Sequence, residues 1–169
     1  DEESSDLYMM NADGSGQIAL TDWRDRYGVR SPVWSPDGTR IAFTYQGLGG
    51  RDIWIVHADG SGLTRLALNP GTDSTPAWSP DGTRIAYVSF EAKKPVVYVQ
   101  NLATGGRQAV ANFRGSNSSP AWSPDGSQIA FSSDRDGAFA LYTVDATGNG
   151  SRVSRTLGTS LDPSWTPDA

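Results

Sequence analysis

The feature that most constrains this fold is a tandem repeat. Copies built on Pro-x-Trp-(Ser/Thr)-Pro-Asp occur around Trp34, Trp78 and Trp122, and a shortened copy occurs around Trp165. Successive tryptophans are 44, 44 and 43 residues apart. A near-constant period between about 20 and 50 residues is typical of solenoids, propellers and arrays. Each copy is therefore expected to be one structural unit that buries its apolar faces against its neighbours.

Each copy has the pattern of a β-hairpin. Pro-Asp-Gly favours a tight turn because Pro presets φ, Asp bonds its own backbone and Gly accepts a positive φ. The residues after the first such turn, 39–45, are rich in β-branched and aromatic types, which predicts a strand. Prolines flank each tryptophan before the turn, so the first strand should be short and lie at a sheet edge. The innermost strand of a propeller blade is such an edge.

A second motif predicts two more strands per repeat. Asp-Leu-Tyr-Met-Met at 6–10 matches Asp-Ile-Trp-Ile-Val at 52–56, and weaker copies occur at 96–101 and 140–145. Gly-rich turns follow and lead into predicted fourth strands at 17–21, 63–67, 107–111 and 152–156. The predicted fold is all-β: a β-propeller of four-stranded antiparallel blades in a single domain, 1–169. Three blades are complete, at about 31–67, 75–111 and 119–156, and the two termini, 6–21 with 162–168, form a composite partial blade.

The composite blade lacks its second strand, which leaves three interpretations of the ring. The chain closes on itself as a small four-bladed ring, two copies share composite blades as a homodimer that completes the propeller, or the chain is a piece of a longer propeller. Each blade is apolar on both faces, so an open arc exposes a hydrophobic surface at each end. An isolated open monomer is therefore the least favoured state.

Composition excludes several classes of function. A net charge of −5 and a pI near 4.7 remove the electrostatic basis for binding nucleic acid or anionic membranes. No apolar run approaches the roughly 18 residues of a membrane span, so no membrane insertion is expected. The chain has no cysteine and one histidine, which argues against disulfides and zinc.

The repeated motif resembles a known family. Trp-Ser-Pro-Asp-Gly-Thr-Arg-Ile-Ala-Phe at 34–43, followed by Asp-Ile-Trp-Ile-Val and Ala-Asp-Gly-Ser-Gly, is similar to the TolB-type β-propeller repeat, and the likeness covers essentially residues 6–168. The resemblance implies a periplasmic or extracellular protein that acts by binding partner proteins. Similar blades occur in the propeller domains of prolyl-oligopeptidase-like and tricorn-like peptidases.

The sequence offers little for catalysis. A Ser-His-Asp device needs a histidine base and a Gly-x-Ser-x-Gly elbow; His57 lies inside a third-strand repeat, and no elbow occurs. Ser15 and Ser61 lie in Gly-Ser-Gly turns and are expected to shape them. The chain is therefore predicted not to be an enzyme and to need no cofactor.

Calcium is the one metal that the sequence leaves open. Asp134 and Asp136 flank Arg135 before a glycine, a spacing that an oxygen-ligated Ca²⁺ can use. The alternative is a hairpin turn in which both carboxylates accept backbone N–H bonds and pair with Arg135. The aspartates of the repeated turns are interpreted as structural, since every repeat has one: Asp37, Asp81, Asp125 and Asp168.

Binding is expected at one mouth of the channel. The segments that lead into each first strand, at 22–30, 68–74, 112–118 and 157–161, differ most from copy to copy and should collect there. Aromatic and Arg side chains are the usual interface anchors, although Trp23 and Tyr27 could equally cover a blade junction. The candidate binding residues are Trp23, Arg24, Arg26, Tyr27, Arg30, Asp73, Ser74, Asn117 and Ser118.

These observations favour a non-enzymatic scaffold that recognises a protein or peptide at the loop mouth. Two alternatives stay open. One is the propeller portion of a larger peptidase or other hydrolase, which gates or supports a separate catalytic domain. The other is a carbohydrate-binding propeller, which exposed aromatic side chains would permit.

Overall fold

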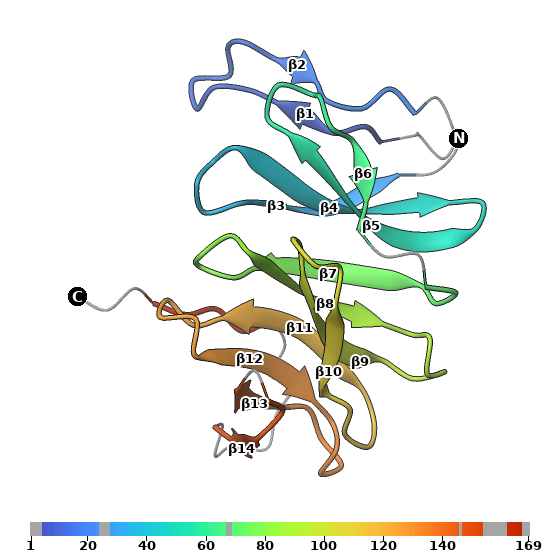
Figure 1. Cartoon of the computed structure of the whole chain (residues 1–169), viewed down its shortest axis with the longest axis vertical. Coiled ribbons are helices and arrows are strands. Elements are labelled where there is room, and N and C mark those ends of the chain that lie inside the picture. The colour runs from blue at the N-terminus through green and yellow to red at the C-terminus, as the bar shows by residue number, and fades with distance from the viewer. Residues whose placement is uncertain (1–4, 24–27, 67–68, 146, 154–161, 167–169) are drawn as a thin grey trace.

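A computed structural model describes residues 5–23, 28–66, 69–145, 147–153 and 162–166, and Figure 1 shows the arrangement of the strands. Three four-stranded antiparallel sheets follow one another along the chain, each in the order of the sequence. Their strands are β3 (Val29–Trp34), β4 (Arg40–Gly47), β5 (Gly50–His57) and β6 (Thr64–Arg65), then β7 (Asp73–Trp78), β8 (Arg84–Ser89), β9 (Val96–Asn101) and β10 (Arg107–Ala111), then β11 (Asn117–Trp122), β12 (Gln128–Ser133), β13 (Ala140–Asp145) and β14 (Gly150–Arg152). The predicted four-strand repeat is confirmed.

A smaller sheet of β1 (Tyr8–Met9) and β2 (Ile18–Ala19) precedes the first complete one. It corresponds to the third and fourth strands of a repeat, as the sequence predicted. In Figure 1 this hairpin lies at the top of the molecule, and the β11–β14 sheet lies at the bottom. The described residues therefore form a stacked row of sheets, in which residues 162–166 contact β11 and are not paired with β1 or β2, and closure into a ring is not shown.

The repeated turns form as predicted. Gly38, Gly82 and Gly126 take φ between 67° and 70°. Asp37 accepts hydrogen bonds from the Ser35 hydroxyl at 2.6 Å and from the Thr39 N–H at 3.0 Å. The aspartates of the other two turns accept the equivalent bonds. These donors, the serine hydroxyl above all, lower the pKa of Asp37, Asp81 and Asp125 to about 2. Asp168 lies outside the described residues.

The first strand of each four-stranded sheet contains a bulge that the sequence did not predict. The pairing register shifts between Arg30 and Val33, between Ser74 and Ala77, and between Ser118 and Ala121. In each case the residue before the first proline has a positive φ, and the shortened repeat shares it: Ser31, Thr75, Ser119 and Asp162, at 51–56°. A non-glycine residue rarely adopts this conformation. The bulges bend β3, β7 and β11, which are edge strands and contact one another in the order β3, β7, β11.

One contact, made by the repeated tryptophan, links neighbouring sheets. The Trp78 indole N–H donates to the Val33 carbonyl at 3.2 Å, and Trp122 donates to Ala77 at 3.2 Å. Each acceptor directly precedes the tryptophan of the preceding sheet. Arginines of the preceding sheets lie over the same rings: Arg40 is 4.7 Å from the Trp78 ring centroid and Arg84 is 4.6 Å from that of Trp122. Trp78 and Trp122 therefore each bind the preceding sheet through one hydrogen bond and one cation–π contact.

The core lies between the sheets. Its clusters join each pair of neighbours, and the strand-two aromatic residues Phe43, Tyr87 and Phe131 are fully buried. No helix in the described part of the chain is long and apolar enough to cross a membrane.

Candidate functional site at the loop mouth

The antiparallel order places two kinds of loop on the same side of the molecule. The connections into β3, β7 and β11 emerge there, together with the β4–β5, β8–β9 and β12–β13 hairpin loops. In Figure 1 those of the first two four-stranded sheets lie to the right and those of the last sheet lie at the bottom. This side is the predicted mouth. Residues 24–27, 68 and 157–161 of the predicted mouth loops lie outside the described residues, and they include the candidates Arg24, Arg26 and Tyr27.

Trp23 covers the junction between the first hairpin and the next sheet. Its ring lies 3.7 Å from that of Tyr45, 5.5 Å from that of Trp54 and 5.8 Å from that of Phe43, measured between ring centroids. Its backbone N–H also donates to the Asp6 carboxylate at 2.9 Å. The structure thus gives Trp23 the packing role that the sequence analysis held as the alternative to ligand contact.

Asp73 and Asn117 occupy equivalent positions at the start of β7 and β11, and both are fully buried. The Asn117 amide donates to the Phe113 and Pro95 carbonyls at 3.1 and 3.2 Å, and its oxygen accepts from Ser133. Asp73 accepts two bonds from Asn69, and burial raises the pKa of its carboxyl. Both side chains are buried and hydrogen-bonded to the mouth loops, so they position these loops and cannot contact a ligand directly.

Arg30, Ser74 and Ser118 are also equivalent to one another, each just before a bulge. Arg30 is exposed, and the two serines are half-buried. The structure places them within the edge strands β3, β7 and β11, whereas the sequence predicted them in the loops that lead into these strands.

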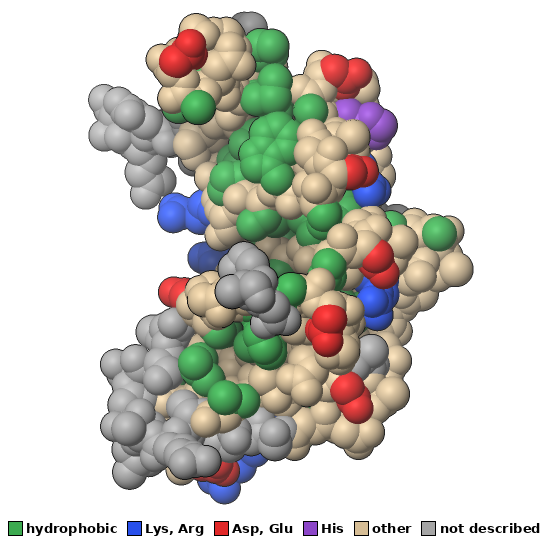
Figure 2. Space-filling model, turned by 90° about the vertical axis from the view of Figure 1, so that its left-hand side faces the viewer, with side chains coloured by type: hydrophobic (Ala, Val, Ile, Leu, Met, Phe, Trp, Pro, Cys, Tyr) green, Lys and Arg blue, Asp and Glu red, His purple; other side chains and the backbone are tan. Residues whose placement is uncertain are grey.

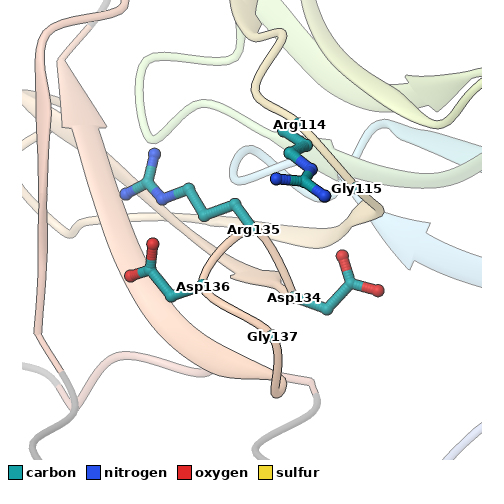
Figure 3. A pocket seen from close by; sticks show the side chains of 6 residues that line it. All are labelled: Arg114, Gly115, Asp134, Arg135, Asp136 and Gly137. Atoms are coloured by element: carbon teal, nitrogen blue, oxygen red, sulfur yellow. The ribbon is translucent and has the colours of Figure 1, made fainter.

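A hollow of about 460 Å³ opens between the last two mouth loops of the described chain. Figure 3 shows its lining: Arg114 and Gly115 come from the loop into β11, and Asp134, Arg135, Asp136 and Gly137 come from the β12–β13 hairpin. From the sequence, the hairpin was expected to be either a calcium site or a structural turn, and Arg114 was not among the candidate binding residues. The hollow could have been predicted from the strand order, because Arg114 and Arg135 both lie in segments that meet at the same end of a blade.

Asp134 links the β12–β13 hairpin to the loop that leads into β11. Its carboxylate accepts the Ser116 N–H at 2.6 Å. Gly115, at φ 76°, has no room for a side chain, since a Cβ there would lie 2.1 Å from the Asp134 oxygen. The loop into β11 therefore requires a glycine where the hairpin carboxylate approaches.

Arg135 lies on a platform of aromatic rings. Its guanidinium carbon is 3.6 Å from the Tyr142 ring centroid and 4.1 Å from that of Phe113. The Tyr142 hydroxyl donates to Asp136 at 2.7 Å, and burial, together with this carboxylate, raises the pKa of Tyr142. A guanidinium that lies over aromatic rings has five N–H groups and can still donate to a partner.

The geometry supports the hairpin interpretation of Asp134 and Asp136 over the calcium interpretation. Their carboxylates point in different directions in Figure 3. Asp134 accepts the Ser116 N–H of the neighbouring loop, and Asp136 accepts the Tyr142 hydroxyl. Within the described ranges, no three His, Asp or Glu side chains come close enough to share a metal ion. Two details differ from that interpretation: Asp136 accepts the Tyr142 hydroxyl, where a backbone N–H was predicted, and Arg135 stacks on aromatic rings.

The residues considered for catalysis lie apart from the mouth. His57 ends β5 on the side of the Pro-Asp-Gly turns and is exposed. The Ser15 and Ser61 hydroxyls donate to Asp13 and Asp59, two residues earlier, at 2.7 and 2.6 Å. Both serines shape their turns, as predicted.

Comparison with known proteins agrees with this architecture. Its sheets match those of β-propeller proteins: TolB from Acinetobacter baumannii superimposes with a TM-score of 0.73 at 24% identity, covering 87% of this chain and 37% of that one. A Mycobacterium tuberculosis puromycin-hydrolyzing peptidase gives a TM-score of 0.73 at 20% identity, covering 89% of this chain and 26% of that one. The fold is thus propeller-like.

The family follows from the sequence match. The model of the TolB beta propeller domain matches residues 73–169, more than half of the chain, and the chain belongs to this family. The Tol-Pal system protein TolB of Anaeromyxobacter dehalogenans is 49% identical over 41 residues, which are 24% of this chain and 9% of that protein. The chain thus matches a small part of the length of this curated relative.

Proposed function

We propose that the chain is a non-enzymatic binding module that recognises a protein or peptide at its loop mouth. The observation that supports this most directly is the hollow between the last two mouth loops, where Arg114 is exposed and Arg135 is fixed over Tyr142. Guanidinium groups next to aromatic surface are the usual anchors of protein interfaces. Family membership agrees with such a role, and we place the protein in the periplasm or outside the cell.

The mixed charge of the hollow favours a polypeptide ligand over a small anion. Two arginines and two aspartates line it, and Asp134 and Asp136 are already bonded to protein donors. The positively charged groups that a ligand could contact are therefore the guanidinium groups of Arg114 and Arg135. We therefore expect a segment that places an acidic side chain or a chain of carbonyls against these two groups.

The test is panning of a displayed random peptide library against the wild-type chain, followed by affinity measurement of the selected peptides. Arg114→Gln should weaken binding about tenfold or more, the loss of roughly 1.4 kcal/mol typical of an interface anchor. Gln108→Glu changes the net charge equally but lies on exposed β10 surface outside the hollow, so it should leave the affinity unchanged. Selected peptides that bind all three proteins equally well would refute the proposed site.

A second candidate is the propeller portion of a larger hydrolase, favoured by the superposition on part of the puromycin-hydrolyzing peptidase. In that case the coding sequence adjoining this chain would encode a hydrolase domain. The carbohydrate alternative rests on exposed rings near the mouth such as Phe90, which is 43% exposed, and glycan-array binding that Phe90→Ala abolishes would support it.

A further inference from the structure

A second hollow lies on the side of the molecule opposite the loop mouth. Its volume is about 310 Å³, and it opens between the β3–β6 sheet and the β9–β10 turn of the next sheet. Figure 2 looks onto this side and shows acidic side chains scattered over it, with the single histidine at the surface. None of the described residues that line the hollow is an Asp or a Glu. In a chain of net charge −5, such a lining favours an anionic ligand.

Arg40 and His57 form the polar wall of this hollow. They lie directly opposite each other in the pairing of β4 with β5, so their side chains leave the sheet on the same face. Arg40 donates one N–H to the Gly82 carbonyl at 3.0 Å and lies over the Trp78 ring, which holds the guanidinium in place. A guanidinium has five N–H groups, so this bond leaves donors for a ligand.

The His57 side chain is not used by its own turn, unlike its counterparts. In the other repeats the residue at this position bonds to its turn at 2.8–3.0 Å: Asn11, Asn101 and Asp145. After His57, the Asp59 carboxylate closes the turn instead, by accepting the Ser61 N–H and hydroxyl. Neither ring nitrogen of His57 bonds to a residue that the structure describes. The ring lies against Gly62, where a Cβ would be 2.7 Å from its Cδ2, and it can donate at least one N–H in either charge state.

The remaining wall of the hollow is apolar. Ile55 lies two residues before His57 on the same face of β5. Leu66 and Leu102, from the two neighbouring sheets, pack with Ile55 at the rim of the core cluster between them. All three side chains are only partly buried, so they leave carbon surface for a ligand.

The other charged groups near the hollow already have partners. Arg65 lines it, but its side chain forms an ion pair with Asp52 at 2.5 Å. Asp37 and Asp59, the carboxylates that interact electrostatically with the two side chains of the polar wall, accept hydrogen bonds from their own turns. The polar wall therefore supplies the donors that a ligand can reach.

An equivalent hollow of about 320 Å³ in the next sheet shows what the repeat alone produces. Arg84 and Asn101 take the places of Arg40 and His57 there. However, Asn101 bonds to its own turn, and Arg84 forms an ion pair with Asp81 at 3.5 Å. The repeat geometry creates both hollows, and the donors of the first one differ in being left for a ligand.

We propose that the hollow beside His57 binds a carboxylate that is attached to an apolar group. Arg40 and His57 donate to the carboxylate, and the aliphatic wall contacts the apolar part. Its size, near the lower end of the range of about 300–1,000 Å³ for ligand sites, suits a small group. A free organic acid carries this chemistry, and so does the C-terminal residue of a peptide that ends in an apolar side chain. The site is separate from the loop mouth and does not depend on the function proposed above.

Titration with sodium hexanoate, followed by ¹H–¹⁵N NMR spectra of the whole chain, tests the proposal. The backbone amide signals of Gly62 and Gly105, which line the hollow, should shift and reach saturation. Acetate lacks the apolar chain and hexanol lacks the charge, so each should bind at least about tenfold more weakly. Equal affinities for hexanoate and acetate would contradict the proposed apolar contact. A peptide ending in Gly-Gly-Leu, with a free or an amidated C-terminus, distinguishes the two sources of the carboxylate.

Substitutions in the polar wall provide the second measurement. Arg40→Gln and His57→Ala should each weaken hexanoate binding about tenfold, the loss typical of a hydrogen bond to a charged group. Arg84→Gln is the matched control, since it removes the same stacking from Trp122 but leaves this hollow intact, and the affinity should not change. Tighter binding of hexanoate than of the free-acid peptide would identify an organic acid as the ligand, and the reverse order would identify a peptide C-terminus. The absence of saturable shifts at the two glycines, or shifts unchanged in both polar-wall variants, would overturn the proposal.

Discussion

The contribution of the repeated tryptophan to the junctions between sheets can be measured with Trp122→Phe. The substitution keeps an aromatic ring but removes the N–H that donates to Ala77 at 3.2 Å. It also weakens the stacking of Arg84, because indole is a better partner for a cation than phenyl is. A net hydrogen bond contributes about 1 kcal/mol and an exposed cation–π contact about 0.5–1 kcal/mol. The smaller ring leaves unfilled space at a site that is 8% exposed, which costs about a further 1 kcal/mol.

We therefore expect Trp122→Phe to lower the free energy of unfolding by about 2–3 kcal/mol. The matched control is Trp34→Phe, the same chemical change at an equivalent position that is 49% exposed and makes neither contact with the residues that the structure describes. A change within about 0.5 kcal/mol is expected there. Urea unfolding followed by far-UV circular dichroism measures both, at a concentration at which the chain is monomeric. Equal losses for the two variants would show that the indole only fills space and would refute the proposed linkage.

Two further predictions concern the repeat. Gln128→Arg restores the residue found at Arg40 and Arg84, so a guanidinium should stack on Trp165 and raise the free energy of unfolding by about 0.5–1 kcal/mol; an unchanged urea midpoint would contradict this. The aspartate of the first repeated turn, Asp37, has its pKa lowered to about 2 from about 3.9 in an unfolded chain. Its stabilising effect is complete above about pH 4 and is lost as the pH falls through 2, so Asp37→Asn should reduce the loss of thermal stability between pH 4 and pH 2 relative to the wild type.

Local chemistry explains why much of the fold was predictable. Pro-Asp-Gly specifies its turn through bonds within five residues, as the contacts of Asp37 with Ser35 and Thr39 show. Proline beside Trp78 excludes a central strand, and β7 is indeed an edge strand. Strand boundaries came within a few residues of the predicted ones for the same reason.

The candidate site was less predictable because it depends on contacts between distant segments. The sequence predicted Asp73 and Asn117 to be binding residues in mouth loops. Both are in fact buried, and their side chains are hydrogen-bonded to Asn69 and to the Phe113 carbonyl, respectively. Trp23 lies on three rings from another sheet. The hollow at Arg114 arises because Asp134, on a separate loop, accepts the Ser116 N–H.

The sequence by itself determined the repeating unit, since turn geometry, strand pattern and period are encoded within each copy of about 44 residues. Only the tertiary structure decided how equivalent residues differ. Trp34 and Trp122 occupy the same place in a shared Trp-Ser-Pro-Asp-Gly motif, but one is half exposed and the other is covered. Trp122 packs against the first strand of the preceding sheet, and the described β1–β2 sheet before Trp34 has no such strand. Packing partners come from other repeats, and a local pattern carries no information about whether such a neighbour is present.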